Sequence, residues 1–328
     1  MMENIGLAMV VLGIACAGLL AGAESPSTPP ATKLSTQPAK ELTLDLGNKV
    51  TMKLVQIPAG KFLMGSPETE KDRDKDETQH EVTISKPFYM DVTHVTVDQF
   101  AAFVKDSGYK TDAEKDGRSM GLEIKDGKLD FKYKVNGCSW RNPSFDQKGD
   151  HPVVQVSWND AKTFCDWLAK QSGKTVVLPT EAQWEYACRA GTKTAYPWGD
   201  NPDDGKGWAN CFDQSLKKRW SAATGSASFS WDDGFVFTSP VGSFKANAFG
   251  LYDMNGNAWQ WCQDRYGDYD KGTATDPTGA ATGDLRVLRG GSWYDSPGDN
   301  RSAVRIWIGP GYRHVSGGFR VVVAAGVD

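Results

Sequence analysis

The C-terminal third of the sequence concentrates arginine, tryptophan and tyrosine, the side chains that dominate binding hot spots. The set comprises Arg289, Arg301, Arg305, Arg320, Trp259, Trp293, Tyr294, Trp307 and Tyr312. This composition predicts a patch that binds a partner through ring contacts and charge. Arg305 and Arg320 also fit buried arginines paired with carboxylates, and for these two we expect the structural role.

The four histidines are candidate metal ligands or proton carriers. His80, His94, His151 and His314 are scattered along the chain, without a His-x-x-x-His or similar spacing. We therefore expect structural roles rather than metal ligation. His314 follows Arg313 within the arginine- and aromatic-rich segment, so it is also a candidate for lining a binding groove.

The first 23 residues have the pattern of an export signal. Residues 5–20 are apolar apart from small residues, and Ala21-Gly22-Ala23 matches a small-x-small cleavage site. The N-terminal residues 1–4 lack the Lys or Arg that export signals usually carry. The alternatives are a short transmembrane anchor, for which the stretch is short and rich in Gly and Ala, and a lipid-modified Cys16. We expect cleavage, no membrane span in the mature chain, and a periplasmic or extracellular protein.

An exported protein folds in an oxidising compartment, where cysteines form disulfides. Five cysteines follow the expected cleavage site: Cys138, Cys165, Cys188, Cys211 and Cys262. Their odd number predicts at least one thiol that is free or bonded to another chain. The sequence leaves the pairing open, and Cys188 or Cys211 with Cys262 is conceivable.

The bulk composition is that of a soluble globular protein, with 39% hydrophobic and 24% charged residues. A net charge of −4 gives no reason to expect nucleic acid as a partner. Residues 24–43 are rich in Pro, Ser and Thr and predict a linker between the signal and the domain. Residues 44–328 show no internal repeat and no second linker, so we expect one domain. We also expect a monomer.

Three helices are predicted by capping boxes, in which a hydroxyl side chain is followed by Gln or Asp three residues later. They begin after Thr96, Ser157 and Thr180, and the first and third end near Gly108 and Gly191. Short strands are expected at Lys53–Ile57, Lys61–Met64, His80–Ile84, Phe88–Met90, Arg286–Arg289 and Gly318–Val323. Loops 105–150 and 199–232 are either surface insertions or groove walls, with a hairpin around Asp126-Gly127 in the first.

Six residue strings, taken in order, resemble one protein family. They lie at 57–66 (IPAGKFLMGS), 151–158 (HPVVQVSW), 178–187 (LPTEAQWEYA), 250–261 (GLYDMNGNAWQW), 289–293 (RGGSW) and 318–321 (GFRV). The chain resembles the formylglycine-generating enzymes, or sulfatase-modifying factors, over roughly residues 50–324. The resemblance implies an α+β fold, a variant of the C-type lectin-like fold with few helices, short strands and much irregular structure. It also implies oxidation of a cysteine on a target protein to formylglycine by two copper(I)-binding cysteines.

Those two cysteines are missing here. Asp295 stands at the position of the first, and the second falls on Asn300 or Pro297, depending on where a short gap is placed. Copper(I) prefers soft thiolate ligands, so we do not expect copper or the copper-dependent reaction. Ser316 replaces an Asn that the family often has.

The helix cysteines also depart from the family. Cys165 and Cys188 align with cysteines that form disulfides in some members, but Ser302 and Val321 occupy the places of their partners. These two bridges therefore cannot form.

Calcium is the cofactor that the resemblance favours, as a structural ion. The implied first site comprises Asn210, Asp233 and the carbonyls of Cys211 and Phe235. The implied second site comprises Asp253, the carbonyls of Gly256 and Ala258, and Gln260. Calcium takes six to eight oxygens, and irregular Gly- and Asn-rich loops supply carbonyl ligands. Ordinary turn chemistry is the alternative, and Gln260 in place of the usual Glu removes a negative charge from the second site.

The resemblance finally implies a substrate groove. Its candidate residues are Trp259, Ser292, Trp293, Tyr294, Asp295, Arg301, His314 and Ser316. We expect this groove to bind a protein, peptide or glycan partner, or to support a different oxidation, as in siderophore-maturing relatives. The alternatives are an active oxidase that matures sulfatases and a lectin-like surface module.

Overall fold

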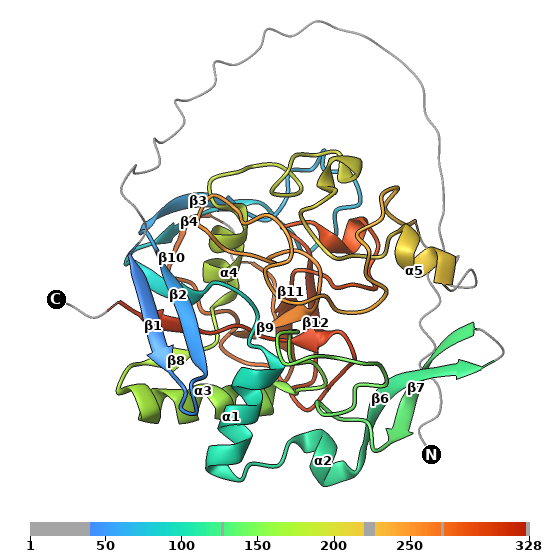
Figure 1. Cartoon of the computed structure of the whole chain (residues 1–328). Helices are drawn as coiled ribbons and strands as arrows, with labels where there is room; N and C mark the ends of the chain where they lie inside the picture. Colours follow the sequence, from blue (N-terminus) through green and yellow to red (C-terminus); the bar gives the residue numbers. More distant parts are fainter. Residues whose placement is uncertain (1–39, 126–127, 220–226, 270–271, 326–328) are drawn as a thin grey trace, which may run out of the picture. The chain divides into compact units, whose positions relative to one another are not determined.

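The computed structural model describes residues 40–125, 128–219, 227–269 and 272–325 (Figure 1). The helices are α1 (Val97–Ser107), α2 (Asp112–Asp116), α3 (Trp158–Ser172), α4 (Glu181–Arg189) and α5 (Gln214–Arg219). The strands are β1 (Glu41–Asp45), β2 (Thr51–Ile57), β3 (Gly60–Met64), β4 (His80–Ile84), β5 (Phe88–Asp91), β6 (Arg118–Lys125), β7 (Lys128–Asn136), β8 (Val176–Val177), β9 (Trp259–Arg265), β10 (Ala274–Thr275), β11 (Arg286–Arg289), β12 (Arg305–Ile308), β13 (Gly317–Gly318) and β14 (Val322–Ala324). Short strands and long loops dominate, as predicted.

The three predicted helices are confirmed, with their caps. Thr96, Ser157 and Thr180 each accept a hydrogen bond from the backbone three residues later, and each capping box is complete. The first helix ends at Gly108, which adopts the left-handed conformation at φ 66°. The helix α4 ends one residue before Gly191, at Ala190 in the same left-handed region.

The strands form four sheets. Their orders are β1-β2-β5-β14-β8, β10-β4-β3, β12-β11-β9-β13 and the hairpin β6-β7. The predicted strand Gly318–Val323 is wrong as a single element, because its two ends belong to different sheets. Gly318 pairs with Gln260 of β9, whereas Val322 pairs with Met90 of β5.

Two further boundaries differ from the sequence predictions. The strand β1 begins at Glu41 and pairs with β2, so the last residues of the predicted linker belong to the sheet. The predicted hairpin forms from β6 and β7, but its turn at residues 126–127 lies outside the described residues. Export-signal residues 1–23 also lie outside them.

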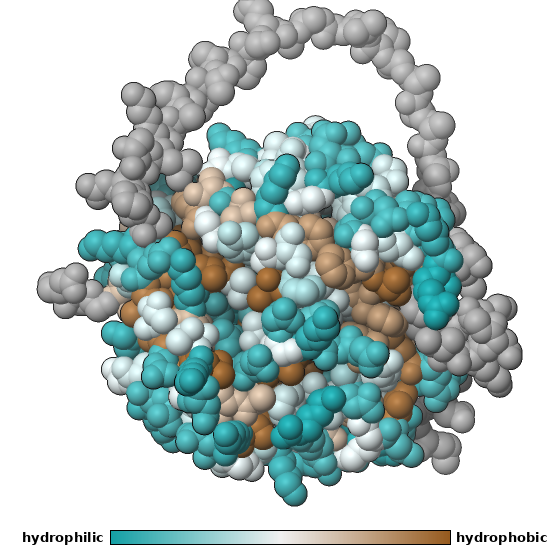
Figure 2. Space-filling view, in the orientation of Figure 1, coloured by the Kyte–Doolittle hydropathy of each residue, from teal (hydrophilic) through white to brown (hydrophobic). Residues whose placement is uncertain are grey.

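The largest apolar core is rich in aromatic rings packed between α1 and α3. Phe100 packs edge-on against Phe103 and Phe319, at centroid distances of 5.3 and 6.3 Å. Phe164 of α3 stacks on Phe100 at 6.0 Å. Buried aromatic pairs of this kind contribute about 0.5–1.5 kcal/mol beyond the area that they bury. On the face shown in Figure 2, hydrophilic residues break the apolar surface into separate patches.

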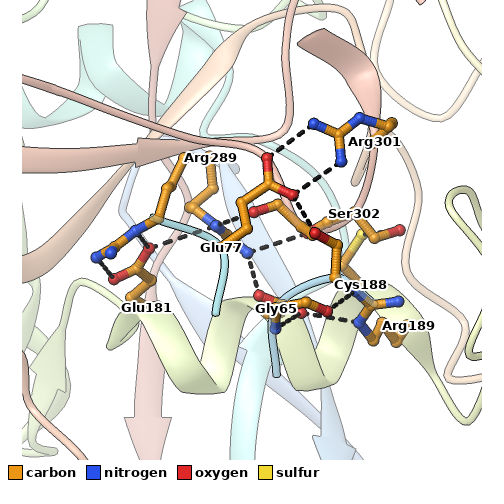
Figure 3. Close-up of polar contacts among 12 residues, drawn as sticks. Gly65, Glu77, Glu181, Cys188, Arg189, Arg289, Arg301 and Ser302 are labelled. Atoms are coloured by element: carbon orange, nitrogen blue, oxygen red, sulfur yellow. Dashed lines mark hydrogen bonds and ion pairs between the residues drawn. The ribbon is translucent and has the colours of Figure 1, made fainter. Parts of the chain in front are cut away.

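Buried ion pairs connect loops to this framework (Figure 3). Arg289 of β11 pairs with Glu181 and Glu185, two carboxylates on successive turns of α4. Glu185 also pairs with Arg189 at 2.8 Å, and its Oε1 accepts a hydrogen bond from the backbone of Gly65. The side chains of these charged residues are at most 4% exposed, so each charge depends on its partners for stabilisation.

Arg305 and Arg320 are both buried, as predicted, but only Arg305 pairs with a carboxylate. Arg305 contacts Glu181 at 2.7 Å. Arg320 instead donates to neutral oxygens, namely the side chain of Gln260 at 2.6 Å and the carbonyl of Asp91 at 3.0 Å. Its predicted carboxylate partner is therefore replaced by amide oxygens.

All five cysteines of the described chain are buried and free. The conceivable bridges from Cys188 or Cys211 to Cys262 are absent among them. Cys188 lies 3.6 Å from Ser302 Oγ, the residue at the place of a family disulfide partner. Burial raises the pKa of the Cys188 thiol to about 11, so the thiol stays protonated at neutral pH.

Candidate binding pocket

A pocket of about 200 Å³ opens over the four-stranded sheet. Its floor comes from the sheet, through Trp259 and Trp261 of β9, Leu288 of β11 and Ile306 of β12. The remaining lining residues are Val156, Tyr294, Asp295, Tyr312, Arg313, His314, Ser316 and Gly317. The pocket is therefore an apolar and aromatic hollow with a few polar groups at its edge.

Asp295 is the acidic residue of this pocket. Its carboxylate accepts hydrogen bonds from Ser292 Oγ and from the side chain of Trp259. Burial, and secondarily the charge of Asp299, raises the pKa of Asp295 to about 7. Asp295 therefore exchanges a proton near neutral pH, and in its protonated form it also donates a hydrogen bond.

Asn300 lies behind Asp295 and holds its loop. The Asn300 side-chain amide donates to the carbonyls of Asp295 at 2.8 Å and Ser296 at 2.9 Å. Asn300 is fully buried and is not among the lining residues. Gly291 has φ 69°, and a Cβ there would overlap the Asn300 side chain, so this tight approach requires glycine.

His314 and Ser316 form another edge of the pocket. His314 Nδ1 lies 2.6 Å from Ser316 Oγ. Burial lowers the pKa of His314 to about 4, so the ring is neutral at physiological pH. Phe131 of β7 stacks on His314 at 5.5 Å and packs edge-on against Tyr294 at 4.3 Å, so the hairpin supports this wall.

The structure brings together five of the eight predicted groove residues. Trp259, Tyr294, Asp295, His314 and Ser316 line the pocket. The other three lie elsewhere.

Ser292 and Trp293 are buried behind the wall, where Trp293 packs between Phe145 and Phe237. Arg301 does not line the pocket and pairs with Glu70 at 2.6 Å. It also pairs with Glu77 at 2.7 Å (Figure 3). The assignment of Arg301 to the groove is therefore corrected: two buried carboxylates from a distant loop hold this cation.

Several lining residues were not predicted. Trp261, Leu288 and Ile306 are apolar residues on three adjacent strands, and in the sequence they resemble any other core residues. Tyr312 was part of the aromatic patch but was not assigned to the groove. The signal available for it was its position two residues before His314.

The residues of the first implied calcium site lie close together, and one of their oxygens has no partner. The Asp233 carboxylate accepts hydrogen bonds from the backbone of Cys211 at 3.1 Å and Phe235 at 2.7 Å, so these residues lie together. Asn210 Oδ1 is buried without a hydrogen-bond partner. Burial and the nearby Asp213 raise the pKa of Asp233 to about 8. The residues fit a calcium ion, which would use these oxygens.

The second implied site does not fit. Gln260 Oε1 accepts hydrogen bonds from Trp184 at 2.7 Å and Arg320 at 2.6 Å. The carbonyl of Ala258 lies 2.7 Å from His94 Nε2. A calcium ion would have to displace these contacts and would lie close to the Arg320 guanidinium. Burial raises the pKa of Asp253 to about 6, and this shift by itself does not indicate a bound cation.

Within the described ranges, no three His, Cys, Asp or Glu side chains cluster as they do in a metal centre. The first implied calcium site would not meet this criterion, because amide and carbonyl oxygens make up most of its implied ligands. The same ranges contain no helix that is long and apolar enough to span a bilayer.

Comparison with known proteins agrees with this architecture. Residues 44–325 match the Sulfatase-modifying factor enzyme 1-like domain. The chain is 36% identical over 258 residues to the formylglycine-generating enzyme of Streptomyces coelicolor, covering 73% of this chain and 78% of that one. It is 35% identical over 309 residues to the inactive Cα-formylglycine-generating enzyme 2 of Bos taurus, covering 86% and 92%.

Among solved structures, PvdO from Pseudomonas aeruginosa superposes with a TM-score of 0.66 at 30% identity, covering 89% of this chain and all of that one. The predicted α+β fold is therefore confirmed. The chain belongs to the sulfatase-modifying factor, or formylglycine-generating-enzyme-like, family.

Proposed function

We propose that this chain binds a peptide segment of a partner protein in the pocket around Asp295 and does not carry out the copper-dependent oxidation of cysteine. The observation that carries the proposal is the chemistry at the two positions of the family cysteines. Asp295 offers a carboxyl group at the first position. The second falls on Asn300, which uses both amide hydrogens to hold its own loop, or on Pro297. None of these residues is a thiolate, the ligand that copper(I) selects.

The size of the pocket supports binding of one group from a larger ligand. Pockets that enclose a whole small molecule measure about 300–1,000 Å³, and this one measures about 200 Å³. Its aromatic rings suit an apolar or planar side chain, and the Asp295 carboxyl suits a polar atom at the edge of that side chain.

The relatives include proteins named as formylglycine-generating enzymes and proteins named as inactive. The similarity to a Bos taurus protein named as inactive extends over more of this chain than the similarity to the Streptomyces enzyme. This greater coverage supports binding rather than catalysis as the function. We also infer that this member is exported and that calcium at Asn210 and Asp233 stabilises its loops.

Two assays test the proposal. In the first, the protein is incubated with copper, oxygen and a peptide carrying the Cys-x-Pro-x-Arg motif, and peptide mass is followed. We expect no formylglycine. Turnover at a rate comparable to that of the Streptomyces relative would refute the proposal and establish the alternative, an active oxidase that matures sulfatases.

The second assay measures binding by peptide and glycan arrays. Peptide binding should weaken in Tyr294→Ala, which removes a pocket wall. It should be unchanged in Trp307→Ala, a control aromatic residue that is 43% exposed and lies outside the pocket. Glycan binding without peptide binding would instead establish a lectin-like module.

A further inference from the structure

A second hollow adjoins the pocket and shares two residues with it. This hollow measures about 290 Å³. It is lined by Asp116, Arg118, Ser119, Met120, Tyr133, Lys134, Gly311, Tyr312 and Arg313. Tyr312 and Arg313 line both hollows, so together the two form one groove with an apolar half and a polar half.

The polar half has an excess of positive charge. Three cations line it, Arg118, Lys134 and Arg313, against one anion, Asp116. Arg313 and Asp116 form an ion pair with each other. Arg118 and Lys134 are exposed, and their side chains make no ion pair within the described part of the chain. Two cations therefore remain available to a ligand.

The hairpin places these two cations on one face. Arg118 of β6 pairs with Asn136 of β7, and Lys134 lies two residues before Asn136. Both side chains line the same hollow, so the hairpin presents the two cations to one ligand. The register shifts between Ser119 and Gly121, a bulge of the kind that redirects side chains next to binding sites.

The hairpin is also fixed relative to the apolar pocket. Buried Gln155 accepts a hydrogen bond from Ser119 Oγ at 2.6 Å and donates to the carbonyl of Met120. Phe131 packs against both Tyr294 and His314. A ligand seated against Tyr294 therefore meets Arg118 and Lys134 at a defined place along the groove.

We propose that Arg118 and Lys134 form a subsite for a carboxylate, and that the peptide recognised by this chain carries an acidic residue next to its apolar anchor residue. This inference rests on the proposed function, because it names the chemistry of the peptide bound in the same groove. Guanidinium and ammonium groups donate charge-assisted hydrogen bonds to carboxylates, and a field of one sign also accelerates encounter.

The test uses short amidated peptides with a central Trp, Tyr, Phe or Leu, flanked on either side by Glu or by Gln. Fluorescence anisotropy at low and high salt measures their affinities. We expect the Glu peptides to bind about two- to thirtyfold more tightly than the Gln peptides, the range for two exposed ion pairs. High salt should remove most of this preference.

The variant Arg118→Glu/Lys134→Glu should abolish the preference for Glu and favour Lys-flanked peptides instead. Lys170→Glu/Lys174→Glu makes the same change in net charge at exposed residues that line neither hollow, and it should keep the preference. All these positions are exposed, so folding should be unaffected, and circular dichroism checks this.

The outcomes are distinguishable. Equal affinities for Glu and Gln peptides would overturn the acidic subsite and leave peptide binding intact. Equal losses in both double variants would indicate a general charge effect and also overturn the subsite. The absence of binding by any peptide would refute the proposed function, and the inference with it.

Discussion

Glu77 offers a sharp test of how loops are held in this domain. Its carboxylate accepts hydrogen bonds from Arg301 at 2.7 and 2.8 Å and from Ser66 Oγ at 2.7 Å. The side chains of Glu77 and Arg301 are 0% and 2% exposed. Glu77→Gln keeps the shape but leaves the buried Arg301 cation with one carboxylate, Glu70.

Breaking a buried ion pair from one side costs about 3–5 kcal/mol of unfolding free energy. Because Glu70 remains, we expect the lower end, about 3 kcal/mol. For a domain of this size, each kcal/mol lowers Tm by about 2–4 °C, so the expected decrease is about 6–12 °C. Urea unfolding and calorimetry measure the two quantities.

The matched control is Glu41→Gln, which breaks the exposed pair between Glu41 and Lys53, whose side chains are 57% and 53% exposed. Exposed pairs contribute about 1 kcal/mol or less. If Glu77→Gln lowered the free energy of unfolding no more than this control, the reasoning that burial strengthens the pair between Glu77 and Arg301 would be refuted.

Acid should reproduce the effect of the substitution. Burial acts to raise the pKa of Glu77, but the hydrogen bonds and charge of Arg301 outweigh it, so the folded-state pKa lies below 4.5. The unfolded state therefore binds more protons in that range. The contribution of Glu77 is complete above the unfolded-state pKa and is lost as pH falls through the folded-state pKa, and Glu77→Gln should flatten that acid limb.

Three further predictions concern the pocket, the cation and the thiols. The folded-state pKa of Asp295, about 7, exceeds its ordinary value of 3.8, so folding takes up a proton between these pH values. The contribution of Asp295 to the free energy of unfolding therefore falls as pH rises from about 4 to 7. Asp295→Asn should remove up to about 4 kcal/mol of the change in unfolding free energy between pH 4 and 7; an unchanged difference between these pH values in urea unfolding would contradict the shift. Calcium should raise Tm and a chelator should lower it, and Asp233→Asn should abolish the response; a wild-type Tm indifferent to both would remove the calcium proposal. The five buried cysteines should resist an alkylating reagent in the native state and react fully in denaturant without reductant, as read by mass; a thiol that stayed blocked in denaturant would reveal a disulfide.

Local signals were sufficient to predict the helices. Thr96 and Gln99 act on each other within one turn, so the capping box is visible in the sequence and is present in the structure. The strand β9 gave no such signal. It is buried on both faces, at Trp259 and Trp261 on one and at Gln260 and Cys262 on the other, so exposed polar residues do not alternate along it.

Long-range contacts explain what the sequence could not predict at the site. Arg301 meets Glu77 across 224 positions of sequence, and no local pattern links the two. Leu288 and Ile306 become pocket floor only because β11 and β12 pair beside β9. Asp295 was predicted as a groove residue because it stands at the position of the first cysteine of the family. Its pKa near neutral pH could not be predicted, because it results from burial that only the folded chain provides.

The hairpin of β6 and β7 has a consequence for how this domain diversifies. Within the described chain these two strands pair only with each other, yet Arg118 and Lys134 line the groove, and Phe131 packs against His314 in its wall. Residues 118–136 can therefore change in length or sign of charge without breaking a ladder elsewhere in the domain. Exchange of this single segment, in evolution or in the laboratory, can therefore change which ligand the groove prefers while the rest of the domain keeps its sequence.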